Sequence, residues 1–140
     1  MSAIVDHWLN SKGWEFHSSH RQSRTAFELE IAKLNGTQRL ELYVDTRLSL
    51  FAVHAYPTFK IPTAYHAIIL EIIARANWGH EFARFELNLD SKEFRSTSSA
   101  VLAGSELSEA MIERMTMFVL DWLDSFTPTL QSMVVVENLL

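Results

Sequence analysis

The six histidines are the residues best suited to bind a metal ion, because a neutral imidazole nitrogen is a common metal ligand. Only His17 and His20 lie close together, and the other four are scattered at positions 7, 54, 66 and 80. No His-Glu-x-x-His run occurs, and no other spacing has the geometry of a zinc site. The histidines are therefore expected to be solvated or hydrogen-bonded, and neither a metal nor another cofactor is predicted.

Catalytic patterns based on nucleophiles or carboxylates are also missing. The sequence has no Gly-x-Ser-x-Gly run and no cysteine, and its four glycines form no phosphate-binding pattern. Gly104-Ser105 is interpreted as a turn before a helix. Two carboxylate pairs, Asp121 with Asp124 and Glu109 with Glu113, fall on the expected solvent face of an acidic helix, where such residues usually serve solubility. No catalytic residue is predicted, and the protein is expected not to be an enzyme.

Length and composition indicate a folded protein. The chain has 140 residues, the usual size of one domain, so residues 1–140 are expected to form a single domain. A net charge of −5 would repel phosphate backbones, which argues against nucleic-acid binding. No 18-residue apolar run occurs, and the first residues lack the features of a signal peptide. No membrane interaction is expected, and the cytoplasm is the expected location.

The strongest local pattern surrounds Asn35-Gly36, a dipeptide favoured in two-residue hairpin turns because both positions need positive φ. The other face of this hairpin is charged, and Glu30 would lie opposite Glu41. On the apolar face, a turn centred on the dipeptide predicts three facing pairs: Ile31 with Leu40, Leu29 with Leu42, and Phe27 with Val44.

Apolar residues at helix or strand spacing predict the other elements. The stretch from His17 to Arg24, with two arginines and two histidines among serines, is expected to be a polar loop. Polar residues at 96–99 indicate that part of the strand over 94–102 meets solvent. The expected elements are a helix over 4–9 that stops at Gly13, a strand start at 14–16, the hairpin over 27–44, a strand over 48–55, a helix over 62–77, and strands over 83–89 and 94–102.

A long helix is predicted from Leu107-Ser108, and Thr127-Pro128 has the features of a fresh N-cap and first turn for a short final helix. The element order is then one helix, three or four strands, a helix, two strands and a helix. This order indicates an α+β fold with a mainly antiparallel sheet packed with helices. The arc of the long helix expected to be buried contains Leu107, Met111, Met115, Phe118, Val119, Trp122 and Phe126.

Two apolar surfaces could contact a partner. In the helix over 62–77, Ala67, Leu70 and Ala74 fall outside the main apolar stripe, and their small size would let another helix or subunit approach closely. The alternative is that this face packs inside the domain. The tail over 133–140 is also apolar, and it either docks on its own core or covers a neighbour.

The second half of the chain, about 57–136, resembles the YbjN family, a group of bacterial sensory-transduction regulators. The sequence departs from the family at Lys92-Glu93, where members often turn through a glycine, and in its tail, which lacks the usual late glycine. The resemblance is carried by Ile61-Pro62, Ala76-Asn77-Trp78-Gly79, Phe85-Glu86-Leu87-Asn88-Leu89-Asp90, Ser105-Glu106-Leu107-Ser108, Asp121, Asp124 and Pro128.

The resemblance implies the fold of type III secretion chaperones, with the order α-β-β-β-α-β-β-α. Chaperones of this kind are small acidic homodimers that bind extended segments of other proteins. The leading hypothesis is a non-enzymatic protein-interaction module, chaperone-like or regulatory, that forms a homodimer. The alternative is a small-molecule sensor that holds its ligand between sheet and helices, in a pocket lined by Trp78, Trp122 or Tyr65.

Overall fold

The computed structural model describes the backbone of residues 1–139 and the side chains of residues 1–134. Most of the apolar tail therefore lies outside the described side chains, and its predicted docking stays untested. The elements are α1 (Ser2–Ser11), β1 (His17–Arg21), β2 (Arg24–Lys33), β3 (Gly36–Asp45), β4 (Leu50–Pro57), the 3₁₀ turn η1 (Thr63–Tyr65), α2 (His66–Asn77), β5 (Arg84–Leu87), β6 (Phe94–Val101) and α3 (Glu109–Leu139).

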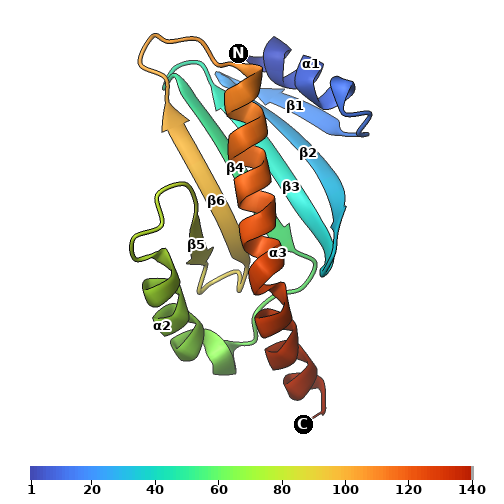
Figure 1. Cartoon of the computed structure of the whole chain (residues 1–140), viewed down its shortest axis with the longest axis vertical. Coiled ribbons are helices and arrows are strands. Elements are labelled where there is room, and N and C mark those ends of the chain that lie inside the picture. The colour runs from blue at the N-terminus through green and yellow to red at the C-terminus, as the bar shows by residue number, and fades with distance from the viewer. Residues whose placement is uncertain (140) are drawn as a thin grey trace.

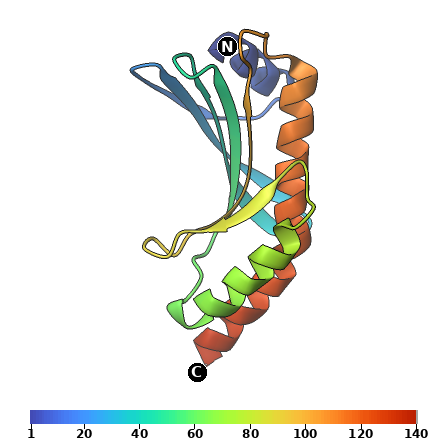
Figure 2. The ribbon, with the colours of Figure 1, turned by 90° about the vertical axis from the view of Figure 1, so that its left-hand side faces the viewer.

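Six antiparallel strands form one sheet with the order β1-β2-β3-β4-β6-β5. The expected α+β fold and element order are confirmed, with four strands before α2. The long helix α3 crosses the sheet (Figure 1). Figure 2 shows that α3 runs along one face of the curved sheet, whereas the opposite face carries no helix. We call this opposite face the open face.

The core lies between α3 and the covered face of the sheet. Alternate strand residues such as Leu42 and Val53 are fully buried there, as period-two alternation requires. From α3, Ile112, Leu120 and Leu123 are fully buried. Burying each such side chain contributes about 1.5–3 kcal/mol. The predicted arc was confirmed in part: Leu107 and Val119 are buried, but the centre of the buried face lies about one position further along the helix. Five of its members are only partly buried: Met111, Met115, Phe118, Trp122 and Phe126.

The predicted hairpin exists, but its register differs by two residues. Lys33 pairs with Gly36, so Leu34 and Asn35 form the turn. Only Gly36 has positive φ, at 126°, whereas the prediction required it at both Asn35 and Gly36. A shift of two preserves the side-chain faces, so the apolar residues still face the core. The observed apolar partners are Leu29 with Leu40 and Phe27 with Leu42, while Ile31 faces Gln38 and Val44 faces Thr25.

The polar loop predicted over 17–24 is largely a strand. Residues His17–Arg21 form β1, which pairs with β2 along its whole length, and every β1 residue is exposed. No apolar alternation marks this strand, because it lies at the sheet edge. The strand predicted to start at Trp14 begins three residues later.

The polar stretch of β6 is more buried than predicted. Ser96 and Thr97 are fully buried and Ser98 is nearly so, whereas Ser99 is exposed. The reason is that β6 lies between β4 and β5, inside the sheet and not at its edge. Ser96 and Ser98 lie on the covered face opposite Ala55 and Val53, whereas Thr97 lies on the open face opposite His54, so a polar sequence of small side chains can occupy an interior strand.

α3 continues through Pro128, so the predicted separate final helix is wrong. Proline lacks the N–H that would normally bond to the carbonyl four residues earlier, which here belongs to Asp124. The Asn35 side chain replaces that donor, since its Nδ2 lies 3.1 Å from the Asp124 carbonyl oxygen. The Asn35 backbone N–H also donates to Asp124 Oδ1 at 2.9 Å. The β2–β3 turn thus supplies a hydrogen bond to the carbonyl that proline leaves without a helical donor.

The paired carboxylates of α3 attach the helix to its neighbours. Asp121 Oδ1 lies 2.6 Å from Lys33 Nζ at the β2–β3 turn. Glu113 accepts hydrogen bonds from Trp8 Nε1 at 2.9 Å and Lys12 Nζ at 2.7 Å, which ties α1 to α3. The face of α3 predicted to be solvated therefore also contacts α1 and the β2–β3 turn, and Glu113 and Asp121 hold these elements against the helix.

Candidate functional site

The predicted contact residues Ala67, Leu70 and Ala74 are all exposed on one face of α2. Trp78, which is 89% exposed, continues the same helical stripe at its C-terminal end. The opposite side of α2 contacts β5, and Ile69 is its only buried residue. The described part of the chain leaves this outward face uncovered. We call Ala67, Leu70, Ala74 and Trp78 the α2 stripe.

The two edges of the sheet differ. β1 pairs with a strand on one side only, so its outer backbone groups face away from the sheet. At the other edge, the Asn77 side chain hydrogen-bonds the backbone of Phe85 in β5. Asn77 Nδ2 donates to the Phe85 carbonyl at 2.9 Å, and the Phe85 N–H donates to Asn77 Oδ1 at 2.8 Å. Asn77 therefore acts as a neighbouring strand would and blocks pairing at that residue.

Aromatic and charged side chains cover the open face. The ring of His54 lies between those of Tyr43 and Tyr56, with centroids 5.4 and 6.4 Å away. The guanidinium of Arg24 lies 4.4 Å from the Tyr43 ring, and that of Arg39 lies 4.1 Å from the Tyr56 ring. These cation–π contacts fix the arginines against the sheet. The open face is therefore polar and ordered.

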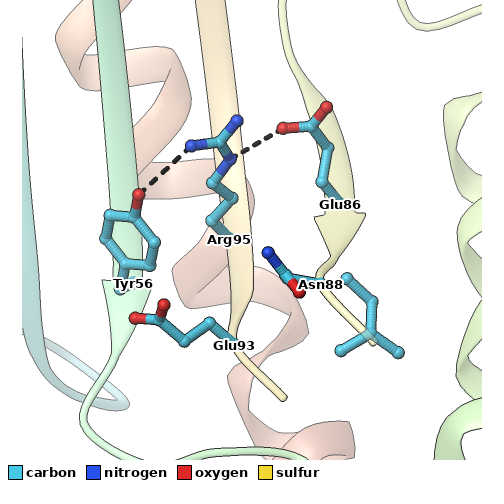
Figure 3. Close-up of a pocket in the computed structure, with 6 residues that line it drawn as sticks. Tyr56, Glu86, Asn88, Glu93 and Arg95 are labelled. Atoms are coloured by element: carbon cyan, nitrogen blue, oxygen red, sulfur yellow. Dashed lines mark hydrogen bonds and ion pairs between the residues drawn. The ribbon is translucent and has the colours of Figure 1, made fainter. Parts of the chain in front are cut away.

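A hollow of about 280 Å³ lies on the open face beside β5 (Figure 3). Arg95 is its central residue, since its Nε donates to Glu86 at 2.7 Å and its Nη1 donates to the Tyr56 hydroxyl at 3.2 Å. Burial raises the pKa of Glu86, but the hydrogen bond and charge of Arg95 outweigh this and hold that pKa below its usual value. Glu93 in turn pairs with Arg39 at 2.9 Å. The main charges of this hollow are thus already paired.

His54 is a buried titratable group of the open face. Burial, followed by the charge of Arg95, lowers the pKa of His54 to about 4. Its Nδ1 lies 2.6 Å from Thr97 Oγ1, so the neutral ring has a hydrogen-bond partner. Over residues 1–134, no group of three or more His, Asp or Glu side chains is placed to hold a metal ion. His17 and His20 lie on the exposed strand β1.

Two glutamates face each other across β2 and β3 on the open face. Glu28 lies opposite Glu41, whereas the predicted partner Glu30 lies opposite Arg39. Burial and then the charge of Glu28 raise the pKa of Glu41. The ionised form of Glu41 is therefore disfavoured in the folded state.

Replacing this charge should stabilise the protein. We expect Glu41→Gln to raise the unfolding free energy by about 0.5–1 kcal/mol at neutral pH, because it removes a like-charge pair. The gain should fade as the pH falls through the raised pKa of Glu41, since the wild-type carboxyl then becomes neutral too. Urea unfolding of both proteins over this pH range measures the difference. The control Glu30→Gln loses an attraction to Arg39 and should give no gain; equal shifts in both variants would contradict the prediction.

The aromatic residues expected to line a ligand pocket do not converge on the hollow of Figure 3. Trp122 stacks on Phe85 with centroids 4.8 Å apart and on His80 at 4.0 Å, so other rings occupy its faces. Trp78 belongs to the exposed α2 stripe, and Tyr65 is half-buried against the core. These positions favour packing and surface contacts for the three residues.

The fold places the protein in a known structural class. The chain is similar to a chain of the solved HopA1-SchA chaperone-effector complex, with a TM-score of 0.62 and 16% sequence identity over 91% of this chain and 92% of that chain. At this identity the likeness concerns the fold alone. The structure therefore has a fold of the type III chaperone kind, as the resemblance implied.

The family follows from the sequence match. Residues 2–132 match the model of the YbjN family, described as "Putative bacterial sensory transduction regulator". The chain therefore belongs to the YbjN family, and the match extends through the first half, beyond the stretch recognised from motifs. No curated protein matches the sequence. No helix of the described backbone is long and apolar enough to cross a membrane.

Proposed function

We propose that this protein is a non-enzymatic protein-binding module, chaperone-like or regulatory, which works as a homodimer. The observation that carries the proposal is the uncovered α2 stripe. Leu70 is 41% exposed and Trp78 is 89% exposed, and between them lies the small residue Ala74. Membership of the YbjN family and the chaperone-type fold support a role in binding other proteins.

A second copy of this chain is the proposed occupant of the α2 stripe. Alanines on both sides of Leu70 leave room for a symmetry-related helix to approach, and a twofold contact would bring each stripe against itself. A hollow lined by Ala74, Trp78, Glu71 and Arg75 lies on the same face. Pairing two such faces would remove the exposed apolar surface from water.

The partner in this proposal is an extended protein segment that adds to the free edge of β1. Unpaired backbone groups at a sheet edge can hydrogen-bond a further strand. We also propose that residues 1–140 act as one domain in the cytoplasm and do not bind nucleic acid. The net charge of −5 supports the last point.

Leu70→Arg should convert the protein from dimer to monomer. An arginine at the centre of an apolar contact would weaken association by about 30-fold or more. Analytical ultracentrifugation over a concentration series measures the change in mass. The matched control is Leu34→Arg, which makes the same replacement at a residue that is 93% exposed in the β2–β3 turn.

The same variants test partner binding. Tagged wild-type protein and Leu34→Arg, cross-linked in native cells, should retain a common protein partner. If the wild type is monomeric, or if Leu70→Arg changes neither the mass nor the partner, the α2 stripe is not the contact face. If the wild type captures no protein in cells, the protein-binding function itself is wrong.

A further inference from the structure

A second hollow, of about 460 Å³, lies where the β1–β2 turn meets the loop after β3. Three arginines line it: Arg21 and Arg24 from the hairpin, and Arg47 from the loop. Its other lining residues are Gln22, Ser23 and Asp45. We call it the arginine hollow. It differs from the hollow beside β5 because its positive charges outnumber its carboxylates three to one.

The only carboxylate lining the arginine hollow is already engaged. Asp45 Oδ1 accepts hydrogen bonds from Ser23 Oγ at 2.9 Å and from the Arg47 N–H at 3.0 Å. Asp45 Oδ2 lies 3.8 Å from Arg24 Nε, and the residue as a whole is only 4% exposed. Asp45 thus holds the turn and the loop together, and it leaves Arg21 and Arg47 without a carboxylate in the hollow.

The arginine hollow brings like charges together, although Arg24 also contacts Asp45 and the Tyr43 ring. Arg21 and Arg24 are direct cross-strand partners at the end of the β1–β2 hairpin, and like charges facing across strands are destabilising. Arg47 adds a third positive charge from a different segment, and all three residues are exposed. In a chain of net charge −5, such a local positive site is complementary to an anionic ligand.

We propose that the arginine hollow binds the carboxylate side chains of an extended acidic protein segment. The hollow is continuous with β1, since Arg21 is the last residue of that strand. A segment added along the free edge of β1 would end beside Arg21, and its residues beyond the last pair would continue past the β1–β2 turn into the hollow. Guanidinium groups bind carboxylates through paired, charge-assisted hydrogen bonds. This inference rests on the proposed protein-binding function and specifies the chemistry of its partner.

A labelled peptide of alternating threonine and glutamate, about nine residues long, is a suitable probe because it favours an extended strand. Fluorescence anisotropy should show saturable binding of this peptide to the wild-type protein. Binding should weaken about tenfold in the single variant Arg47→Glu and about tenfold in the single variant Arg21→Glu. A peptide with glutamine at every glutamate position should bind at least about tenfold more weakly. The control Arg114→Glu makes the same charge change at an exposed residue of α3 and should bind as the wild type does.

Circular dichroism verifies that each variant is folded. Equal binding of the glutamate and glutamine peptides, or unchanged binding in both Arg47→Glu and Arg21→Glu, would overturn the proposal. Full displacement of the peptide by inorganic phosphate, with the same dependence on Arg47, would identify a site for free oxyanions and would also overturn it. If the wild-type protein is a monomer but still binds the peptide through Arg47, the proposed homodimer is wrong and the proposed binding of an acidic segment is supported.

Discussion

The unfolding free energy of the protein is expected to be about 2 kcal/mol lower at about pH 4.5 than at about pH 7.5, through the titration of His54 alone. The pKa of His54 is lowered from 6.5 to about 4, because burial and the charge of Arg95 disfavour the imidazolium. Between these two values the unfolded chain binds a proton that the folded chain does not. Stability from this group is therefore complete above the unfolded pKa and is lost as the pH falls toward the folded one.

A His54→Asn variant isolates this effect. Asparagine can keep a hydrogen bond to Thr97 Oγ1, which lies 2.6 Å from His54 Nδ1, but it does not titrate. Urea unfolding at several pH values should show a shallower loss of stability in the variant than in the wild type. Carboxylates with lowered pKa values, such as Glu86, are present in both proteins, so the difference reports mainly His54. Identical pH slopes in the two proteins would mean that the pKa of His54 is not lowered in the folded protein.

The second large effect concerns Asn35 and Pro128. We expect Asn35→Ala to lower the unfolding free energy by about 1–3 kcal/mol, because it leaves the Asp124 carbonyl without its donor. Pro128→Ala should raise the unfolding free energy by about 2 kcal/mol, since it restores a helical N–H to the same carbonyl. In the Pro128→Ala background, Asn35→Ala should therefore cost clearly less than it does alone.

A double-mutant cycle of guanidinium unfolding curves measures this coupling. The control Leu34→Ala changes a neighbouring turn residue that is 93% exposed, and its effect should be small and independent of Pro128. Strictly additive effects of Asn35→Ala and Pro128→Ala would show that the turn does not replace the missing helical donor.

Asn35 and Pro128 also explain why two predictions from the sequence were wrong, the register of the hairpin and the end of the long helix. Asn35-Gly36 correctly marks a hairpin, and its alternation correctly assigns the faces of β2 and β3. The register was wrong because Asn35 bonds Asp124, a residue far away in the chain. Pro128 was interpreted as a helix boundary for the same reason, since the compensating donor is invisible to any local pattern.

Local patterns also failed where context decides burial. β1 and residues 96–99 of β6 are both polar, yet one is an exposed edge and the other belongs to an interior strand. The departure at Lys92 was informative: Lys92 adopts a φ of 65°, a left-handed conformation that glycine would accept without strain. The sequence could thus indicate a special turn there.

Among the surface residues, those of one helix could be grouped from the sequence, whereas those of different segments could not. The helical spacing of Ala67, Leu70 and Ala74 was enough to place them together on one exposed face. The arginine hollow could not be predicted in this way, because Arg47 comes from a loop more than twenty residues after Arg24. Only pairing of β2 with β3 brings these two segments to one end of the sheet.

The contact between Asn77 and Phe85 limits how copies of this protein can assemble. A fibril that grows by pairing the sheets of successive molecules needs two unpaired edge strands on every subunit, one for each neighbour. Here the Asn77 side chain already hydrogen-bonds the backbone of Phe85 in the four-residue edge strand β5, so the addition of a further strand is favoured at β1. Pairing through β1 would join two molecules, and Asn77 would oppose the attachment of a third at β5.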